Sequence, residues 1–409
     1  MSQLDFRTPC QIASTKSYVI LIEGEPGVGK TTLALYSLLR SKRTLYISYN
    51  EPQESLVKKA QLACGDCYKN LTVYRALSGS IENVYSEMLN ALKDGMAVAL
   101  DSVDAFLATS GLKTERSLLQ LIYEATKINR GTLLLIYEGI NKEGESIKFL
   151  ADAYLKLDTT YILGLPARRI SVIKDRDYPT SVYPFYYTLR GRFEMITNPT
   201  FDLSELFTKK VKPWNRPFGE KSVMKRYEMF HYVLDSSVNV TFEKLYRLWL
   251  AVDYLYHGRT PVIIARPEES PDDLSNTFAK MSGGKEARVV ELTGIPLSDA
   301  KIIISNANDN GVVVFDPLIW EKEAIKQPEL TESALSEMIY DFSKRSIGVI
   351  AFTYEFYKTH EMFMKYSTRV RKIVDVEGQI FMRTLKPPGP LYYFKLIGGQ
   401  EPELVLVPA

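Results

Sequence analysis

The residues best suited to chemistry form the segment GEPGVGKT, which runs from Gly24 to Thr31. Its spacing is G-x-x-x-x-G-K-[ST], in which glycines let the backbone approach an anion closely while successive amide groups point at phosphate oxygens. Lys30 would place a positive charge near the β- and γ-phosphates, and the Thr31 hydroxyl is suited to a magnesium ion. The segment therefore predicts a site for ATP and Mg²⁺.

The flanking residues fit such a loop. Tyr18–Ile22 is a short apolar run typical of a buried strand, and TLALYSLLR after the loop is apolar and typical of a helix. A helix that begins at this point directs its free amide groups and its dipole toward the phosphates. We expect the following residues to contact the nucleotide: Gly24, Glu25, Pro26, Gly27, Val28, Gly29, Lys30, Thr31 and Thr32.

Acidic residues follow three further apolar runs. Glu51 comes after the run at 44–49, and Asp101 and Glu138 end runs of the same kind. Parallel strands bind ligands at their carboxyl ends, so all three acids are expected near the nucleotide. We predict that Glu51 polarises the attacking water, that Asp101 holds Mg²⁺ together with Thr31, and that Glu138 belongs to the nucleotide site.

Two of these assignments have competitors in the sequence. Asp104 lies three residues after Asp101, which we prefer because it ends the apolar run directly. Glu51 directly follows Asn50, and either residue could take the position of the base. Hydrolysis is expected if Glu51 takes the position of the base. Nucleotide binding with little turnover is expected if Asn50 takes it.

The elements that must position these residues predict an α/β fold. Apolar runs typical of strands alternate with helical segments, which favours a mostly parallel, twisted sheet flanked by helices. The predicted strands lie at 18–22, 44–49, 97–100, 132–137, 151–157 and 169–174.

Residues 18–196 resemble the KaiC-like branch of the RecA superfamily. The resemblance is carried in order by GEPGVGKT, YISYNEP, VALDSVD, LLLIYE, ADAYLKLD and RRISVIKDRDYPTSVYPFYYTLRGRFEM. It implies an Mg²⁺-dependent ATPase that assembles into homo-oligomers, with a ring as one arrangement. It also implies that Lys174 and Arg176 reach the γ-phosphate bound by a neighbouring subunit. The catalytic candidates are then Glu51, Lys30, Lys174 and Arg176, although the last two also fit an ordinary solvated strand end.

A degenerate second copy follows the first. Thr44 and Thr260, Asp101 and Asp316, and Glu138 and Glu355 stand in similar surroundings, 215 to 217 residues apart. The segment LDSSVNVTFEKLYRLWLAVDYL stands where the second copy should have its loop, and it contains no glycine. We predict two tandem RecA-like domains, the second without a phosphate loop. Their expected bounds are 1–197 and 225–409, with a linker at 198–224.

This pairing of an intact and a degenerate domain also resembles archaeal regulatory ATPases such as the GvpD group. The resemblance implies that the second domain has a structural or regulatory role and offers a surface to a protein partner. The expected function is an ATPase whose nucleotide state regulates assembly or partner binding. The alternatives are an ATP-sensing scaffold with little turnover and a recombinase-like, DNA-binding ATPase.

The composition bears on partners and location. Lys and Arg number 51 and Asp and Glu 49, so the chain has no overall basic field for nucleic acid, and the DNA-binding alternative is not favoured. The short basic cluster Arg369–Lys372 is expected to be a solvated strand edge. No apolar run approaches the ~18 residues that span a bilayer, and no secretory signal is evident. We expect a cytoplasmic protein without membrane insertion.

The three cysteines, Cys10, Cys64 and Cys67, are too few for a disulfide framework. With three histidines in the chain, a structural zinc site is not favoured either. Cys64 and Cys67 form a lone C-x-x-C, which fits a simple loop or a disulfide.

Overall fold

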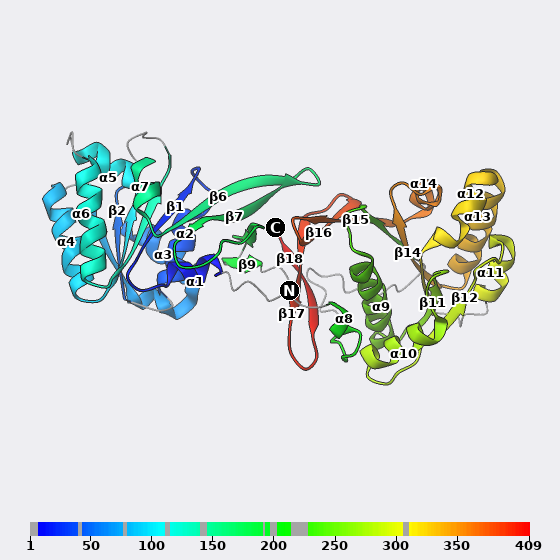
Figure 1. Cartoon of the computed structure of the whole chain (residues 1–409). Coiled ribbons are helices and arrows are strands. Elements are labelled where there is room, and N and C mark those ends of the chain that lie inside the picture. The colour runs from blue at the N-terminus through cyan, green and yellow to red at the C-terminus, as the bar shows by residue number, and fades with distance from the viewer. Residues whose placement is uncertain are drawn as a thin grey trace. The chain divides into compact units, whose positions relative to one another are not determined.

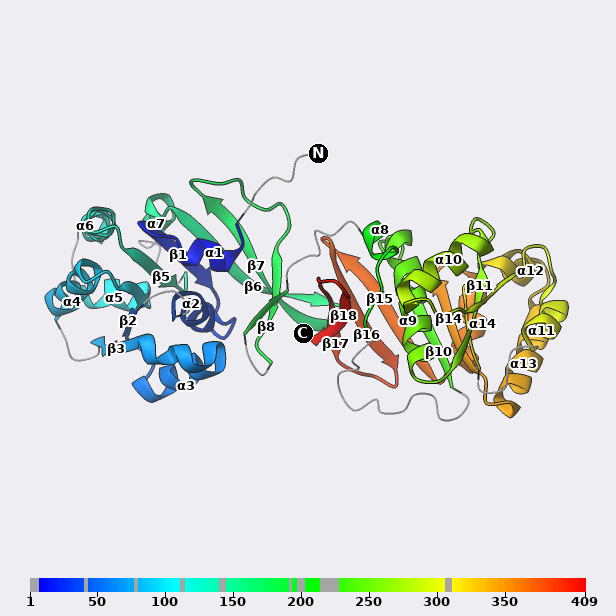
Figure 2. The same ribbon diagram turned by 90° about the horizontal axis from the view of Figure 1, so that it is seen from below.

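The chain forms two compact units, one made of residues up to 197 and one of residues 198–408. Each is described by itself (Figures 1 and 2). The computed structural model describes residues 7–39, 43–76, 80–110, 115–139, 145–190, 193–196, 203–213, 228–305 and 311–409.

Unit 1 contains a nine-stranded sheet with the order β3-β2-β4-β5-β1-β6-β7-β8-β9. The strands from β3 to β6 pair in parallel, and β7, β8 and β9 add antiparallel partners at one side. The six predicted strands all occur. The strands are β1 Tyr18–Gly24, β2 Thr44–Ser48, β3 Leu71–Arg75, β4 Ala97–Asp101, β5 Thr132–Tyr137, β6 Ala153–Ile162, β7 Leu165–Asp175, β8 Phe185–Thr188 and β9 Glu194–Ile196.

Helices cover both faces of this sheet, which explains why its strands are continuously apolar instead of alternating. In β1, Ile20 and Ile22 pack toward α1, α2 and α3, whereas Val19 and Leu21 face the core beneath α4 to α7. Figure 1 shows these two helical layers on either side of the sheet. The helices are α1 Pro9–Ala13, α2 Lys30–Leu39, α3 Gln53–Cys64, α4 Ile81–Lys93, α5 Val103–Ser110, α6 Glu115–Ile128 and α7 Glu145–Leu150.

Unit 2 repeats the topology strand for strand, with the order β12-β11-β13-β14-β10-β15-β16-β17-β18. The duplicated α/β fold predicted from the sequence is thereby confirmed. Its strands are β10 Met229–Leu234, β11 Thr260–Ala265, β12 Arg288–Glu291, β13 Gly311–Phe315, β14 Gly348–Tyr354, β15 Arg369–Val376, β16 Gln379–Lys386, β17 Leu391–Ile397 and β18 Glu403–Pro408. Its helices are α8 Leu203–Leu206, α9 Val240–Tyr256, α10 Pro271–Ser282, α11 Leu297–Ser305, α12 Glu321–Lys326, α13 Pro328–Lys344 and α14 Lys358–Tyr366.

The segment predicted as a linker, 198–224, is described only between 203 and 213. This part packs onto unit 2, where Leu206 and Val211 are buried in the core beneath α9. The remainder of the predicted linker lies outside the described residues. Residues 203–213 therefore belong to the second unit and do not form a free connection.

Two smaller features differ from the simplest interpretation of the sequence. The prediction of a solvated edge at Arg369–Lys372 is wrong, because β15 lies between β10 and β16 and Arg371 is buried. The Arg371 guanidinium donates to the Tyr232 hydroxyl at 3.0 Å and lies over the Phe230 ring, so its charge is held inside the unit. Cys64 and Cys67 form a disulfide at the end of α3, one of the two arrangements left open. In the described part of the chain, no helix combines the length and apolar character needed to span a bilayer.

The core of unit 1 should depend on its central strands. Leu134 in β5 is fully buried, whereas Leu62 on α3 is 65% exposed. We expect Leu134→Ala to lower the free energy of unfolding of unit 1 by about 2–5 kcal/mol, because it removes buried methyl groups and leaves a cavity. Urea denaturation measures this. Leu62→Ala is the control and should change stability by less than about 0.5 kcal/mol. Equal effects of the two substitutions would contradict the described packing.

Candidate functional site

An open cavity of about 380 Å³ lies at the carboxyl ends of the parallel strands in unit 1. This size is within the range typical of small-molecule sites. The loop between β1 and α2 forms one wall, and residues after β2, β4 and β5 form the others. The lining residues are Pro26, Gly27, Gly29, Lys30, Thr31, Thr32, Asn50, Glu51, Lys59, Asp101, Glu138 and Leu189.

The positions of the loop that hold glycine require it for different structural reasons. Gly27 and Gly29 adopt φ values of 83° and 102°, a region that disfavours side chains, and both line the cavity. Gly24 does not line it. A Cβ on Gly24 would lie 2.5 Å from the Leu157 carbonyl oxygen of β6, so this glycine permits close packing of two strands. This packing accounts for the glycine at position 24, while its expected contact with the nucleotide stays a prediction.

Lys30 is the first residue of α2, and its side chain points back into the loop. Its ammonium group donates to the carbonyl oxygens of Gly24 and Glu25 at 2.7 and 2.9 Å. Glu138 lies 3.9 Å away across the cavity. Burial lowers the pKa of Lys30, and the charges of Glu138 and Asp101 oppose this shift. The loop thus holds a cation at the point where phosphates would enter.

Thr31 and Asp101 lie next to each other. The Thr31 hydroxyl donates to Oδ2 of Asp101 at 2.9 Å, and the buried hydroxyl of Tyr46 donates to the same oxygen at 2.5 Å. Burial raises the pKa of Asp101, while these two hydrogen bonds lower it. The structure places Asp101, and not Asp104, beside Thr31.

These oxygen atoms suit a magnesium ion. Mg²⁺ prefers carboxylate and hydroxyl oxygens, and in nucleotide sites it needs only one or two protein ligands besides phosphates and water. Thr31 and Asp101 supply one hydroxyl and one carboxylate at the mouth of the phosphate loop. They are therefore the residues that would hold the ion.

Glu51 and Asn50 both line the cavity. The Glu51 carboxylate forms an ion pair with Lys59 of α3 and accepts a hydrogen bond from the Ser55 hydroxyl at 3.2 Å. Its backbone is fixed by the Ser48 hydroxyl, which donates to the Glu51 carbonyl oxygen at 2.9 Å. Glu51 thus reaches the cavity with a charged partner already beside it.

Glu138 lies opposite the loop, and Asp104 holds it there. The backbone amide of Glu138 donates to Oδ2 of Asp104 at 2.7 Å. Asp104 is 6% exposed and stands behind Glu138, away from the lining of the cavity. Asp104, the alternative candidate for the metal site, therefore supports the backbone of Glu138 instead.

The remaining predicted loop residues divide into two groups. Pro26 and Thr32 line the cavity. Val28 is buried in the core, and its carbonyl oxygen accepts a hydrogen bond from the hydroxyl of Tyr187 in β8. Glu25 is exposed, and its carbonyl oxygen binds Lys30. Val28 and Glu25 thus shape the loop through their backbones.

Lys174 and Arg176 lie at the opposite edge of the sheet. Lys174 pairs in register with Tyr154, which is paired with Leu21, three residues or about 10 Å before Gly24 along β1. Lys174 donates to the Phe149 carbonyl oxygen at 2.9 Å. Burial is the main factor that lowers the pKa of Lys174, with Arg176 adding to it. Neither cation lines the cavity of its own chain.

Arg176 already has partners within its own chain. Its guanidinium lies 3.1 Å from the fully buried carboxylate of Asp152 and donates to the Tyr123 hydroxyl at 2.9 Å. Lys127 approaches the other Asp152 oxygen at 2.7 Å. These contacts fix the side chain at the edge from which the strands begin.

Sequence reasoning missed four residues of the site: Tyr46, Lys59, Tyr187 and Leu189. Tyr46 had a detectable signal, because a tyrosine in an otherwise buried strand needs a partner for its hydroxyl group. Lys59 follows Ser55 by four residues and so shares a face of α3 with it. Tyr187 and Leu189 come from distant sequence and had no local signal.

Unit 2 has ion pairs in the position corresponding to this cavity. The guanidinium of Arg266, which follows β11, lies 2.5 Å from Asp316 after β13 and 2.9 Å from Glu243 in the first turn of α9. Arg247 lies 3.4 Å from Glu243 and also pairs with Glu269. Residues 235–239 connect β10 to α9 without a glycine. In unit 2, therefore, arginine and carboxylate side chains pair with one another at the position where unit 1 has its cavity.

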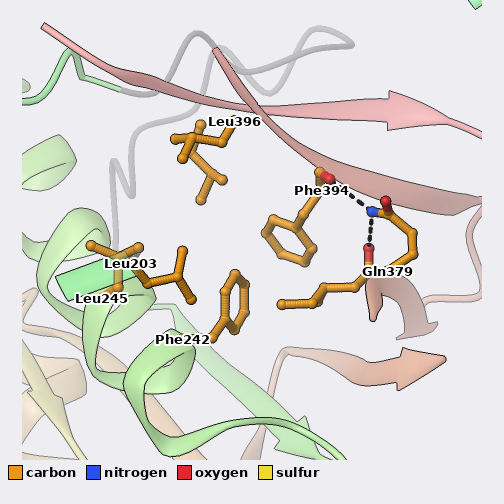
Figure 3. A pocket seen from close by; sticks show the side chains of 8 residues that line it. Leu203, Phe242, Leu245, Gln379, Phe394 and Leu396 are labelled. Atoms are coloured by element: carbon orange, nitrogen blue, oxygen red, sulfur yellow. Dashed lines mark hydrogen bonds between the residues drawn. The ribbon is translucent and has the colours of Figure 1, made fainter. Parts of the chain in front are cut away.

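A second cavity lies in unit 2 between α8, α9 and the last strands (Figure 3). Its volume of about 30 Å³ is far below that of a nucleotide site. Its lining is apolar apart from Gln379, whose amide nitrogen donates to the carbonyl oxygens of Ile380 and Phe394. This cavity is a small packing gap of the second core.

Comparison with known proteins gives a family match within the first unit. Residues 14–192 match the family model described as "ATPase: KaiC". The match covers 179 of the 409 residues and shows that this part of the chain is similar to KaiC-like ATPase domains of the RecA-like P-loop family, a similarity that implies nucleotide binding and ATPase activity. Since unit 2 repeats the strand order of unit 1, the chain consists of two tandem RecA-like domains. A comparison with curated proteins gave no match.

The ion pairs of unit 2 should be necessary for its stability. Arg266→Met leaves Asp316 and Glu243 buried without the cation between them, and we expect unit 2 to lose about 3–5 kcal/mol. Thermal and urea unfolding measure this loss. Arg288→Met removes an exposed arginine from β12 and is the matched control, with an expected change under about 0.5 kcal/mol. If Arg266→Met unfolded like the wild type, these ion pairs would contribute little to the free energy of unfolding of unit 2.

Proposed function

We propose that unit 1 binds Mg²⁺–ATP and hydrolyses it, and that the nucleotide state regulates assembly or partner binding. The observation that carries this proposal is the convergence of Lys30, Thr31, Asp101 and Glu51 on one cavity of about 380 Å³. The loop amides and Lys30 bind the phosphates, while Thr31 and Asp101 hold the metal. Mg²⁺ neutralises charge that develops on the phosphates.

In this proposal Glu51 orients and polarises the attacking water. It comes from the strand end next to Asp101, since Ser48 and Asp101 are paired in register. A carboxylate at this point can accept the proton that leaves the water. Glu138 lies on the opposite side of the cavity, close to Lys30, and helps to orient the ammonium group.

We further propose that Lys174 and Arg176 act on the nucleotide of a second copy. Neither side chain lines the cavity of its own chain, and their contacts with Phe149 and Asp152 hold them away from it. The edge of the sheet where they lie exposes the apolar side chains of Phe149 (82%) and Ile173 (50%), as expected of a surface that meets another protein. Cations delivered there would stabilise charge in phosphoryl transfer.

For unit 2 we propose a structural or regulatory role without nucleotide binding. Two observations support this: the absence of glycine from residues 235–239, and the ion pairs that Arg266 makes with Asp316 and Glu243. Without amides that wrap an anion, triphosphate has no cradle there. The outer surface of the unit is then available to a partner.

A second candidate is an ATP sensor with little turnover. The ion pair between Glu51 and Lys59 favours it, because the ammonium group occupies the carboxylate that would otherwise contact the attacking water. Asn50 beside Glu51 on the cavity wall favours it as well. Turnover measurements separate the two candidates.

We expect the wild-type protein to bind one ATP per chain and to hydrolyse it over many turnovers. Glu51→Gln should bind ATP while turnover falls by about 10²–10⁴-fold, because the general base is lost. Lys30→Met should lose binding, because its ammonium group is required at the phosphates. Isothermal titration and phosphate release measure these quantities. Binding of two nucleotides per chain would contradict the role given to unit 2, and tight binding without turnover in the wild type would favour the sensor.

We expect active sites to form between copies, which a mixing experiment can detect. Glu51→Gln retains the two cations but lacks the base, whereas Lys174→Ala/Arg176→Ala retains the base but lacks the cations. Each variant alone should be inactive. A mixture should regain up to about a quarter of the wild-type rate, because one interface in four combines both intact halves in a randomly mixed assembly.

Arg168→Ala, at the other end of β7, is the control for this experiment and should not alter the rate. A mixture that stays inactive, although wild-type protein at the same concentration is active, would show that Lys174 and Arg176 do not act across copies.

A further inference from the structure

Lys59 is a second cation on the wall of the cavity. It lies on α3, its ammonium group pairs with the Glu51 carboxylate, and the Ser55 hydroxyl donates to the other oxygen of that carboxylate at 3.2 Å. The side chain of Lys59 is 38% exposed, so its long stem retains room to move. Lys30, in contrast, is 6% exposed and is held by two loop carbonyl groups.

The charges that line the cavity give Lys59 a function. The ionisable lining residues are the cations Lys30 and Lys59 and the carboxylates Glu51, Asp101 and Glu138. Asp101 is assigned to the metal, and Glu138 lies 3.9 Å from Lys30, so Glu51 remains as the carboxylate near the proposed place of the terminal phosphate. A γ-phosphate would be repelled by this carboxylate unless a nearby cation offset the two negative charges. Lys59 is the lining cation beside it.

We propose that Lys59 moves from the Glu51 carboxylate to the γ-phosphate when ATP binds, and that this exchange makes the site prefer triphosphate to diphosphate. The inference rests on the proposed function, since it requires ATP in this cavity. A diphosphate bound by the loop ends at its β-phosphate and leaves the Lys59–Glu51 pair in place. A triphosphate supplies a stronger anionic partner for the ammonium group. The exchange also frees Glu51 to accept a proton from water.

The same geometry gives ATP a way to activate its own hydrolysis. In the free site the Lys59 ammonium group occupies the Glu51 carboxylate, so this carboxylate is not available to a water molecule. Once Lys59 contacts the phosphate, its ammonium group no longer pairs with the Glu51 carboxylate, which can then accept a hydrogen bond from water. Lys59 is then a specificity residue for the nucleotide and a positioning residue for Glu51.

The test compares the binding of a non-hydrolysable ATP analogue with that of ADP, both with Mg²⁺, by isothermal titration of the full chain. Lys59→Gln should weaken binding of the analogue by about 10- to 100-fold, the range of one hydrogen bond to a charged group. ADP affinity should stay within about threefold. Lys59→Arg should retain most of the preference for the triphosphate. Lys58→Gln is the matched control, because Lys58 is exposed one residue earlier and should change neither affinity.

Glu51→Gln provides an independent measurement. It removes the competing partner of Lys59, so the triphosphate analogue should bind more tightly than to wild type, while ADP affinity should not change. Equal loss of analogue and ADP affinity in Lys59→Gln, or no loss of either, would overturn the inference while wild-type binding leaves the proposed function intact. Failure of the wild type to bind either nucleotide would instead overturn the proposed function itself.

Discussion

Parallel pairing of β1 with both of its neighbours is the constraint on which the site depends. β1 lies between β5 and β6, and these strands run in the same direction as β2 and β4. Their carboxyl ends therefore open at one edge, where Gly24, Ser48 and Asp101 end three of them. A shift of one residue in β1 would turn its side chains to the opposite face and displace the loop. The packing of Gly24 against Leu157 of β6 holds that register.

The two units have the same topology but stabilise the carboxylate at the end of the corresponding strand in different ways. In unit 1, Thr31 and Tyr46 give hydrogen bonds to Asp101, and the neighbouring cavity remains open to an external cation. In unit 2, the corresponding Asp316 pairs directly with Arg266. A buried carboxylate must have a positive or hydrogen-bonding partner. In the second unit the chain supplies that partner itself, so the fold persists without the glycine loop.

Sequence alone was most informative where the relevant residues are contiguous. The loop from Gly24 to Thr31 could be predicted because its function depends on local backbone geometry, and the strands could be predicted because both faces of the sheet are buried. Asp101 could be assigned as the end of an apolar run. Predicting the fold of the second unit required only the same runs at similar separations.

The remaining features depend on contacts between distant segments. The donation from Tyr46 to Asp101 depends on the register of β2 and β4, which no local pattern specifies. The pairing of Lys59 with Glu51 depends on the angle at which α3 leaves the sheet. The position of Arg371 was mispredicted for the same reason. A charged residue in a strand suggests a solvent-exposed position, and only the packing of distant segments shows that Arg371 lies over the rings of Phe230 and Tyr232. The proposed roles in catalysis require geometry of this kind, and those proposed for Lys174 and Arg176 require a second chain as well.

The position of Lys30 has a consequence for how a ligand would enter. Because the Lys30 ammonium group is bound to the carbonyl oxygens of Gly24 and Glu25, contacts within the chain itself hold the curved shape of the loop. The entropy needed to order the loop is then part of the folding of unit 1 and is not spent again at each association. Such preorganisation strengthens binding without adding a contact. Under the proposed function, phosphate binding would replace the two internal acceptors of the Lys30 ammonium group by phosphate oxygens.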